Sequence, residues 1–132
     1  MSITLTDSDK STLRTAAYGA VSLMAAAGVP HKGVTHGSIA LTSATGLVGH
    51  VLAAKSKDIH LQGKSVAELA DQVLPSLTAA IGLLGEQHPG EADNFRSTVL
   101  VAVEAAVQPS KGEPSPAVAA MARKITAALD AA

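Results

Sequence analysis

Apolar residues recur at three- and four-residue steps along most of this chain, the spacing that places side chains on one face of an α-helix. The first such segment runs from residue 7 to residue 27. Asp7 and Asp9 suit the positive end of its dipole, and the sequence Gly28-Val29-Pro30 predicts that the helix ends there. Its buried face is predicted to contain Leu13, Ala16, Ala17, Ala20, Met24 and Ala27.

Three further helices are predicted in the second half of the chain. Ser65 and Glu68 form a capping box that opens a helix ending near Gly85, with a kink expected at Pro75. The next helix begins near Pro89, and the short connection makes these two helices antiparallel neighbours. The last one follows Ser115-Pro116. Their predicted core stripes are Val66, Leu69, Ala70, Val73, Leu77, Ala80, Ile81 and Leu84, then Phe95, Val99, Ala102, Val103 and Ala106, then Val118, Met121, Ala122, Ile125 and Leu129.

A long stretch without charge lies between these segments. Residues 33–54 contain no Asp, Glu, Lys or Arg, and we expect a second helix over roughly 35–54. A helix without a charged face is normally surrounded by other structure. Its five Ser or Thr residues and two His residues argue against a membrane hairpin. We therefore predict a central helix that is shielded from solvent on every side.

The glycines of this stretch fit a tightly packed helix. Ser38, Thr42 and Gly46 fall at four-residue steps and form a ridge of small side chains, and Gly49 continues an adjacent row. Each glycine costs a helix about 0.5–1 kcal/mol relative to alanine, so close packing has to offset that loss. We expect these four residues to mark a close helix–helix contact.

The two uncharged helices indicate a partner. A five-helix domain has room for one central helix, whereas the first helix also lacks charge from residue 15 to residue 28. Monomeric proteins rarely expose apolar patches larger than a few hundred Å². We therefore predict a homodimer, symmetric by default, that associates through the uncharged helices and engages a protein partner.

Composition limits the chemistry that the chain can support. About a fifth of its 132 residues are alanine and only 2% are aromatic, which is a helical composition. There is no cysteine, hence no disulfide, thiolate metal site or cysteine nucleophile. The net charge of −1 provides no field for nucleic acid or anionic lipid. The first residues do not have the pattern of an export signal, so we expect a cytoplasmic protein.

Histidines are the candidate ligand residues. His36 and His50 are 14 residues apart, which separates them by about 21 Å along one continuous helix, too far to share a metal ion. His31 and His36 can approach each other at the helix start, but zinc usually takes three or more protein ligands. We expect these imidazoles to be capping or partly buried groups. The alternative is a small-molecule or metal site near His31, His36 and His50.

The segment HKGVTHGS, beginning at His31, resembles the phosphorylation site of histidine phosphotransfer domains, which are helical bundles of similar size. In that family two residues separate the histidine from a Lys-Gly pair, whereas His31, Lys32 and Gly33 are contiguous here and follow Pro30. The resemblance implies that His31 or His36 is the phosphate acceptor.

Together these observations predict an all-α, five-helix, bundle-like single domain over residues 1–132, with a central, uncharged, glycine-containing second helix. The function predicted is that of a non-catalytic binding or structural module that acts as a homodimer. We expect no cofactor and no resident metal. The alternative is a pocket protein, enzyme or phosphotransfer module that uses the three histidines.

Overall fold

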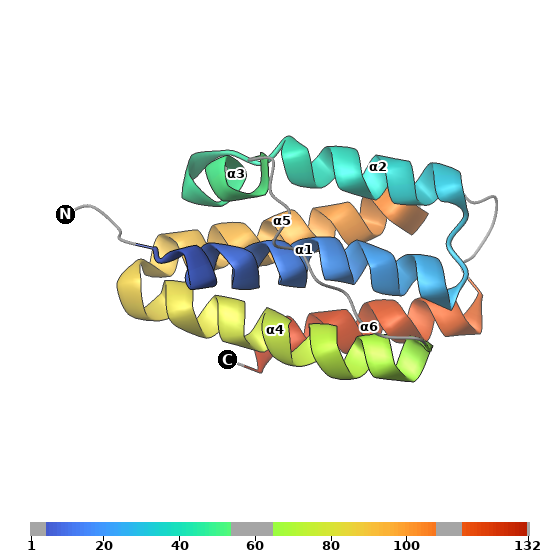
Figure 1. Cartoon of the computed structure of the whole chain (residues 1–132). Helices are drawn as coiled ribbons and strands as arrows, with labels where there is room; N and C mark the ends of the chain where they lie inside the picture. Colours follow the sequence, from blue (N-terminus) through green and yellow to red (C-terminus); the bar gives the residue numbers. More distant parts are fainter. Residues whose placement is uncertain (1–4, 54–64, 108–114, 132) are drawn as a thin grey trace.

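The computed structural model describes residues 5–53, 65–107 and 115–131, and these residues form helices and short connections with no strand. Within this part of the chain none of the helices combines the length and the apolar character needed to cross a membrane. The all-α prediction is confirmed, but the described residues form six helices instead of five (Figure 1). They are α1 (Asp7–Ala27), α2 (His31–Thr42), α3 (Gly46–Ala53), α4 (Val66–Gln87), α5 (Pro89–Val107) and α6 (Pro116–Asp130).

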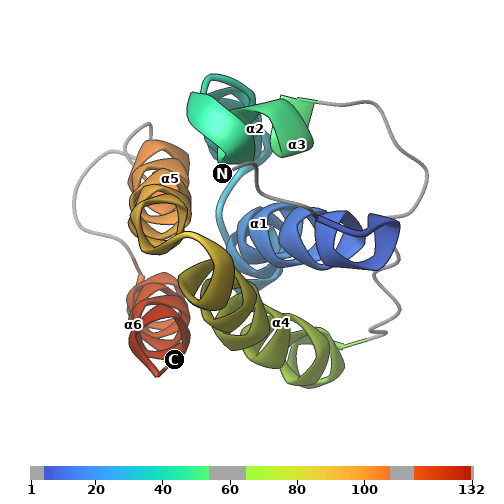
Figure 2. The same cartoon turned by 90° about the vertical axis from the view of Figure 1, so that its left-hand side faces the viewer.

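The central helix is α1, whereas the sequence predicted the second helix in this place. It contacts each of the other five helices, and Figure 2 shows α2 and α3 on one side of it and α4 on the other. Small residues permit this crowding: a Cβ added at Gly19 would lie 2.6 Å from a methyl group of Val73 in α4. The bounds of α1 match the prediction, and its N-terminus is closed by Thr6 and Asp9, which form a capping box.

Helices α4, α5 and α6 form the other half of the core. α4 and α5 run antiparallel across the turn at His88, as predicted, and α6 packs against both (Figure 1). The hydroxyl groups of Ser65 and Ser115 accept hydrogen bonds from the first turns of α4 and α6. α4 continues through Pro75, which is exposed. The buried residues of the three helices are Val73, Leu77, Ala80, Leu84, Ala92, Phe95, Thr98, Val99, Ala102, Val103, Ala106, Val118, Met121, Ile125 and Leu129.

The predicted second helix is wrong as a continuous rod. α2 begins at His31, with Pro30 as its N-cap, and ends at Thr42; α3 begins at Gly46. At the break the hydroxyl groups of Thr42 and Ser43 both donate to the carbonyl of Ile39, which offers the backbone an alternative to continued helix. Gly46 then takes a positive φ of 71°, a conformation that glycine adopts without steric penalty.

Nor is this stretch shielded on every side. α2 buries Gly33, Gly37 and Leu41, while other residues of the helix, Ile39 among them, face solvent. α2 and α3 lie at the periphery of the helix arrangement in Figure 2. α2 is therefore half-buried: one face packs against the protein, and the other face is open to solvent.

Candidate functional site

The close helix contact that the glycines predicted is made by α2 and α5, but at different residues. A Cβ at Gly33 would overlap the backbone carbonyl of Ala106, and one at Gly37 would lie 3.1 Å from the carbonyl oxygen of Ala102. The two glycines are four residues apart on α2, and the two alanines are four residues apart on α5, so one row of residues on each helix contacts the other. The prediction that Ser38, Thr42 and Gly46 form one row required a helix that continues past Thr42. Because α2 ends at Thr42, these three residues do not form a row on one helix.

Those three residues have other environments. Ser38 is half-buried, Thr42 is exposed, and Gly46 lies at the start of α3. Gly49, the fourth predicted packing residue, is buried in α3, and a Cβ there would overlap the carbonyl of Ala44 in the preceding connection. Gly49 therefore allows the chain to fold back at the α2–α3 break.

α3 is held at both of its ends by side chains from other helices. At its N-terminus the Glu91 carboxylate of α5 accepts a hydrogen bond of 3.0 Å from the amide of Leu47. At its C-terminus, Arg14 of α1 donates through Nε to the carbonyl of Val51 at 3.0 Å, and the Tyr18 hydroxyl of α1 donates to that of Leu52 at 2.7 Å. A carboxylate at the positive end and a guanidinium at the negative end both match the helix dipole.

Arg14 and Tyr18 lie one turn apart on α1 and influence each other electrically. The side chain of Arg14 is only 8% exposed. Burial raises the pKa of the Tyr18 hydroxyl above its ordinary value, and the nearby Arg14 charge partly offsets that increase. Tyr18 therefore stays protonated, and able to donate to Leu52, beyond the pH at which a free tyrosine ionises.

The structure places the three candidate histidines on the surface. His31 is the first residue of α2, His36 lies in its middle and His50 is in α3, and all three are exposed. Throughout the described residues, no group of three or more His, Cys, Asp or Glu side chains is placed to hold a metal ion. A ligand role for His31, His36 and His50 stays a prediction.

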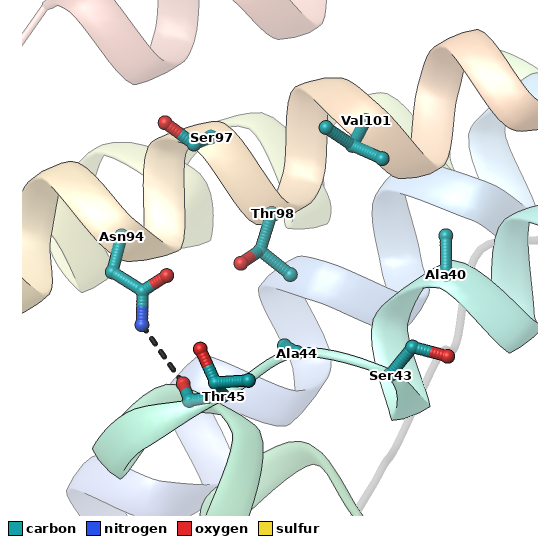
Figure 3. Close-up of a pocket in the computed structure, with 8 residues that line it drawn as sticks. All are labelled: Ala40, Ser43, Ala44, Thr45, Asn94, Ser97, Thr98 and Val101. Carbon is teal, nitrogen blue, oxygen red and sulfur yellow. Dashed lines mark hydrogen bonds between the residues drawn. The ribbon is translucent and has the colours of Figure 1, made fainter.

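A surface depression of about 310 Å³ lies between α5 and the α2–α3 connection (Figure 3). Asn94 spans its edge: its amide nitrogen donates to the carbonyl of Thr45 at 2.9 Å and to the Glu91 carboxylate at 3.2 Å. The lining contains hydroxyl, amide and methyl groups and no charged side chain. The lining residues are Ala40, Ser43, Ala44, Thr45, Asn94, Ser97, Thr98 and Val101.

Sequence reasoning did not identify this depression. One sequence feature could have indicated it: the polar residues Asn94, Ser97 and Thr98 of α5 recur at three- and four-residue steps beside an apolar stripe. That spacing marks a second, polar face on the helix. The opposite wall comes from the α2–α3 connection, which exists only because the predicted long helix is broken.

Two exposed apolar side chains lie on the two helices, α2 and α5, that flank the depression. Among the described residues the large hydrophobic side chains that stand out as exposed are Ile39 at 57%, Val101 at 54% and Val66 at 41%. Val101 lines the depression, whereas Ile39 does not: it lies about 200° around α2 from Gly37, on the face of the helix away from the contact with α5. We call the surface formed by Ile39, Ala40, Ser97 and Val101 the outer face.

No protein-family model, curated protein or solved structure shows significant similarity to the chain.

Proposed function

We propose that the protein is a non-catalytic binding module that forms a symmetric homodimer through the outer face. The observation that carries the proposal is the position of Ile39 and Val101. These two side chains are more than half exposed, and they lie on two helices that pack directly against each other. Burying both against a second copy would remove apolar surface from water, which is the main favourable term in protein association.

The shape of the outer face favours a second copy of the same chain as the partner. A further groove, of about 510 Å³, lies between α5 and α6, and Ser97 and Val101 line both this groove and the depression. The exposed edge of α5 is therefore a ridge with a hollow on each side. A ridge beside a hollow is self-complementary under a two-fold axis, which is what a symmetric dimer requires.

Charge also favours self-association. Residues 33–53 carry no charged side chain, and Glu104 is the one charged residue between Ser97 and Val107. Two copies can approach through this surface with little repulsion between like charges. The depression is lined by no carboxylate, imidazole or amine, so the proposal includes no catalytic step there. As the sequence predicts, we place this module in the cytoplasm.

The test is the mass of the protein in solution, measured by light scattering over a range of concentrations. We expect a dimer mass at micromolar concentration for the unmodified chain and a shift to monomer for Ile39→Asp. Val66→Asp is the matched control, because Val66 is an exposed valine in the first turn of α4 that does not belong to the outer face. A monomer mass for the unmodified protein, or equal dissociation by both variants, would refute the proposal.

A further inference from the structure

Thr98 is a buried threonine whose hydroxyl has no hydrogen-bond partner among the described residues. Its side chain belongs to α5 and the residue is only 8% exposed. Other helical threonines of the protein donate to the carbonyl four residues earlier: Thr12 donates to Ser8, Thr35 to His31 and Thr126 to Ala122. Thr98 does not make the corresponding bond to Asn94.

An unpaired buried hydroxyl is costly. Leaving such a group without a partner costs about 1–3 kcal/mol, and most buried polar groups are therefore paired with protein or with an ordered small molecule. Figure 3 shows the side chain of Thr98 directed from α5 into the depression, towards the connection at Thr45. A molecule in the depression can therefore supply the hydrogen-bond partner that the Thr98 hydroxyl lacks among the described residues.

Two more groups face the same space. The amide nitrogen of Asn94 is committed to two acceptors, the Thr45 carbonyl and the Glu91 carboxylate, so its oxygen points away from them and towards Thr98 (Figure 3). The hydroxyl of Thr45 also extends towards α5 and has no hydrogen-bond partner in the described part of the chain. The depression thus offers one acceptor and two hydroxyl groups that both donate and accept.

These groups define the ligand chemistry. No positive side chain lines the depression, and the neighbouring Glu91 carboxylate disfavours an anion. Methyl groups come from both walls: Ala40 and Ala44 from the side of α2 and its connection, and Val101 from α5. A volume of about 310 Å³ is at the lower end of the range for small-molecule sites. A fitting ligand is small and uncharged, and it carries both hydroxyl and C–H groups.

We propose that the depression between α5 and the α2–α3 connection binds a neutral, polyhydroxylated molecule of about monosaccharide size, with the Thr98 hydroxyl as its buried anchor. Asn94 accepts a hydrogen bond from one ligand hydroxyl, and Thr45 bonds to a second. This site goes beyond self-association, but it shares Ala40, Ser97 and Val101 with the outer face, so a bound molecule and a second copy compete for this surface.

Amide chemical shifts of the isotope-labelled full chain provide the test. D-glucose and myo-inositol are titrated as neutral probes, and D-glucose 6-phosphate as the charged counterpart, into both the unmodified chain and Ile39→Asp. We expect saturable shifts at Thr45, Asn94 and Thr98 with at least one neutral probe, and weaker binding of the phosphorylated sugar. No saturable shift with either neutral probe, or equal binding of the phosphate, would overturn the proposal.

Variants at Thr98 separate a ligand anchor from a structural residue. Thr98→Val has nearly the same shape and should weaken probe binding roughly three- to tenfold, the loss expected for one hydrogen bond. Thr98→Ser should retain binding. Because the hydroxyl has no partner among the described residues, Thr98→Val should fold at least as stably as the unmodified chain. Thr78→Val should be less stable, because Thr78 donates to the carbonyl of Ala128 at 2.7 Å.

Unchanged binding by Thr98→Val, or a loss of stability as large as that of Thr78→Val, would contradict the proposal. Ile39→Asp distinguishes it from the proposed homodimer. Ile39 does not line the depression, so this variant should lose self-association and keep the probe shifts. Loss of both would show that the depression forms only between two copies.

Discussion

α3 and all of α2 beyond Lys32 come from one uncharged stretch of sequence, yet the protein holds the two helices in different ways. α2 is held along its side, where Gly33 and Gly37 bring its backbone against the carbonyl groups of α5. α3 is held at its ends, by Glu91 at one terminus and by Arg14 and Tyr18 at the other. The absence of charge in a helix therefore does not specify burial on every side. The complementary charges are supplied by neighbouring helices, and only to α3.

The largest expected effect concerns the side contact of α2. Gly33→Ala should destabilise the protein by roughly 3 kcal/mol, the upper part of the usual range for overpacking, because the added methyl group meets the backbone of Ala106 and a methyl of Val29. A backbone carbonyl has no rotamer by which to move away. The free energy of unfolding, measured in urea, checks this prediction.

Gly82→Ala is the matched control for that variant. Gly82 lies inside α4, and a Cβ there would have no atom within 4 Å in the described structure. Its replacement should stabilise the protein by about 0.5–1 kcal/mol, which is the usual advantage of alanine over glycine in a helix. If both alanine variants changed stability in the same direction, α2 would not be held by close backbone contact.

The next effect concerns the C-terminal end of α3. Arg14→Leu should reduce the free energy of unfolding by about 2 kcal/mol, since it removes a buried charged donor and leaves the carbonyl of Val51 without it. Hydrogen exchange should accelerate in α3 far more than in α2. Arg96→Leu, which breaks only the exposed ion pair with Asp130, should leave both measurements nearly unchanged. Equal acceleration of hydrogen exchange in α2 and α3 would mean that Arg14 does not hold α3 specifically.

The smallest effect depends on pH and sharpens the role of Tyr18. Because its pKa is raised on folding, chiefly by burial, Tyr18 contributes stability below the ordinary tyrosine pKa of about 10 and loses it as the pH rises through the folded value. Tyr18→Phe should be about 1 kcal/mol less stable at neutral pH, and this difference should shrink above pH 10.

The titration of Tyr18 can be followed directly. It is the only tyrosine of the chain, so the tyrosinate absorbance of the folded protein reports this residue alone. The midpoint should lie above that of the unfolded chain. A midpoint at or below the unfolded value would mean that the hydroxyl of Tyr18 is not buried against α3.

The sequence predicts the parts of this fold that depend on local signals. The bounds of α1 and most of the buried stripes of α4, α5 and α6 follow from periodicity and from caps such as Ser65 and Ser115. The prediction is wrong for Val66, which is 41% exposed at the start of α4. The break between α2 and α3 has local features at Ser43 and Gly46, but it also involves Glu91, which is 44 residues away from the amide that donates to it. Periodicity contains no information about such a partner, so the stretch appeared to be one helix.

The candidate site also combines features that the sequence predicts with features that depend on residues distant in the sequence. Association through the uncharged helices was predicted, but the exposure of Ile39 was not, and the hydroxyl-lined depression needs the break in order to exist. Thr98 in isolation reads as an ordinary helical threonine. The homodimer and the role of His31, His36 and His50 stay predictions, because they concern molecules outside a single chain.

The contact between Gly33 and Ala106 has a mechanical consequence. Where backbone meets backbone there is no intervening side chain to change its rotamer, so a displacement of α2 is passed to α5 without being absorbed. A molecule that binds at Ile39 is therefore expected to move α2 and α5 together, and α5 begins at the turn that follows α4.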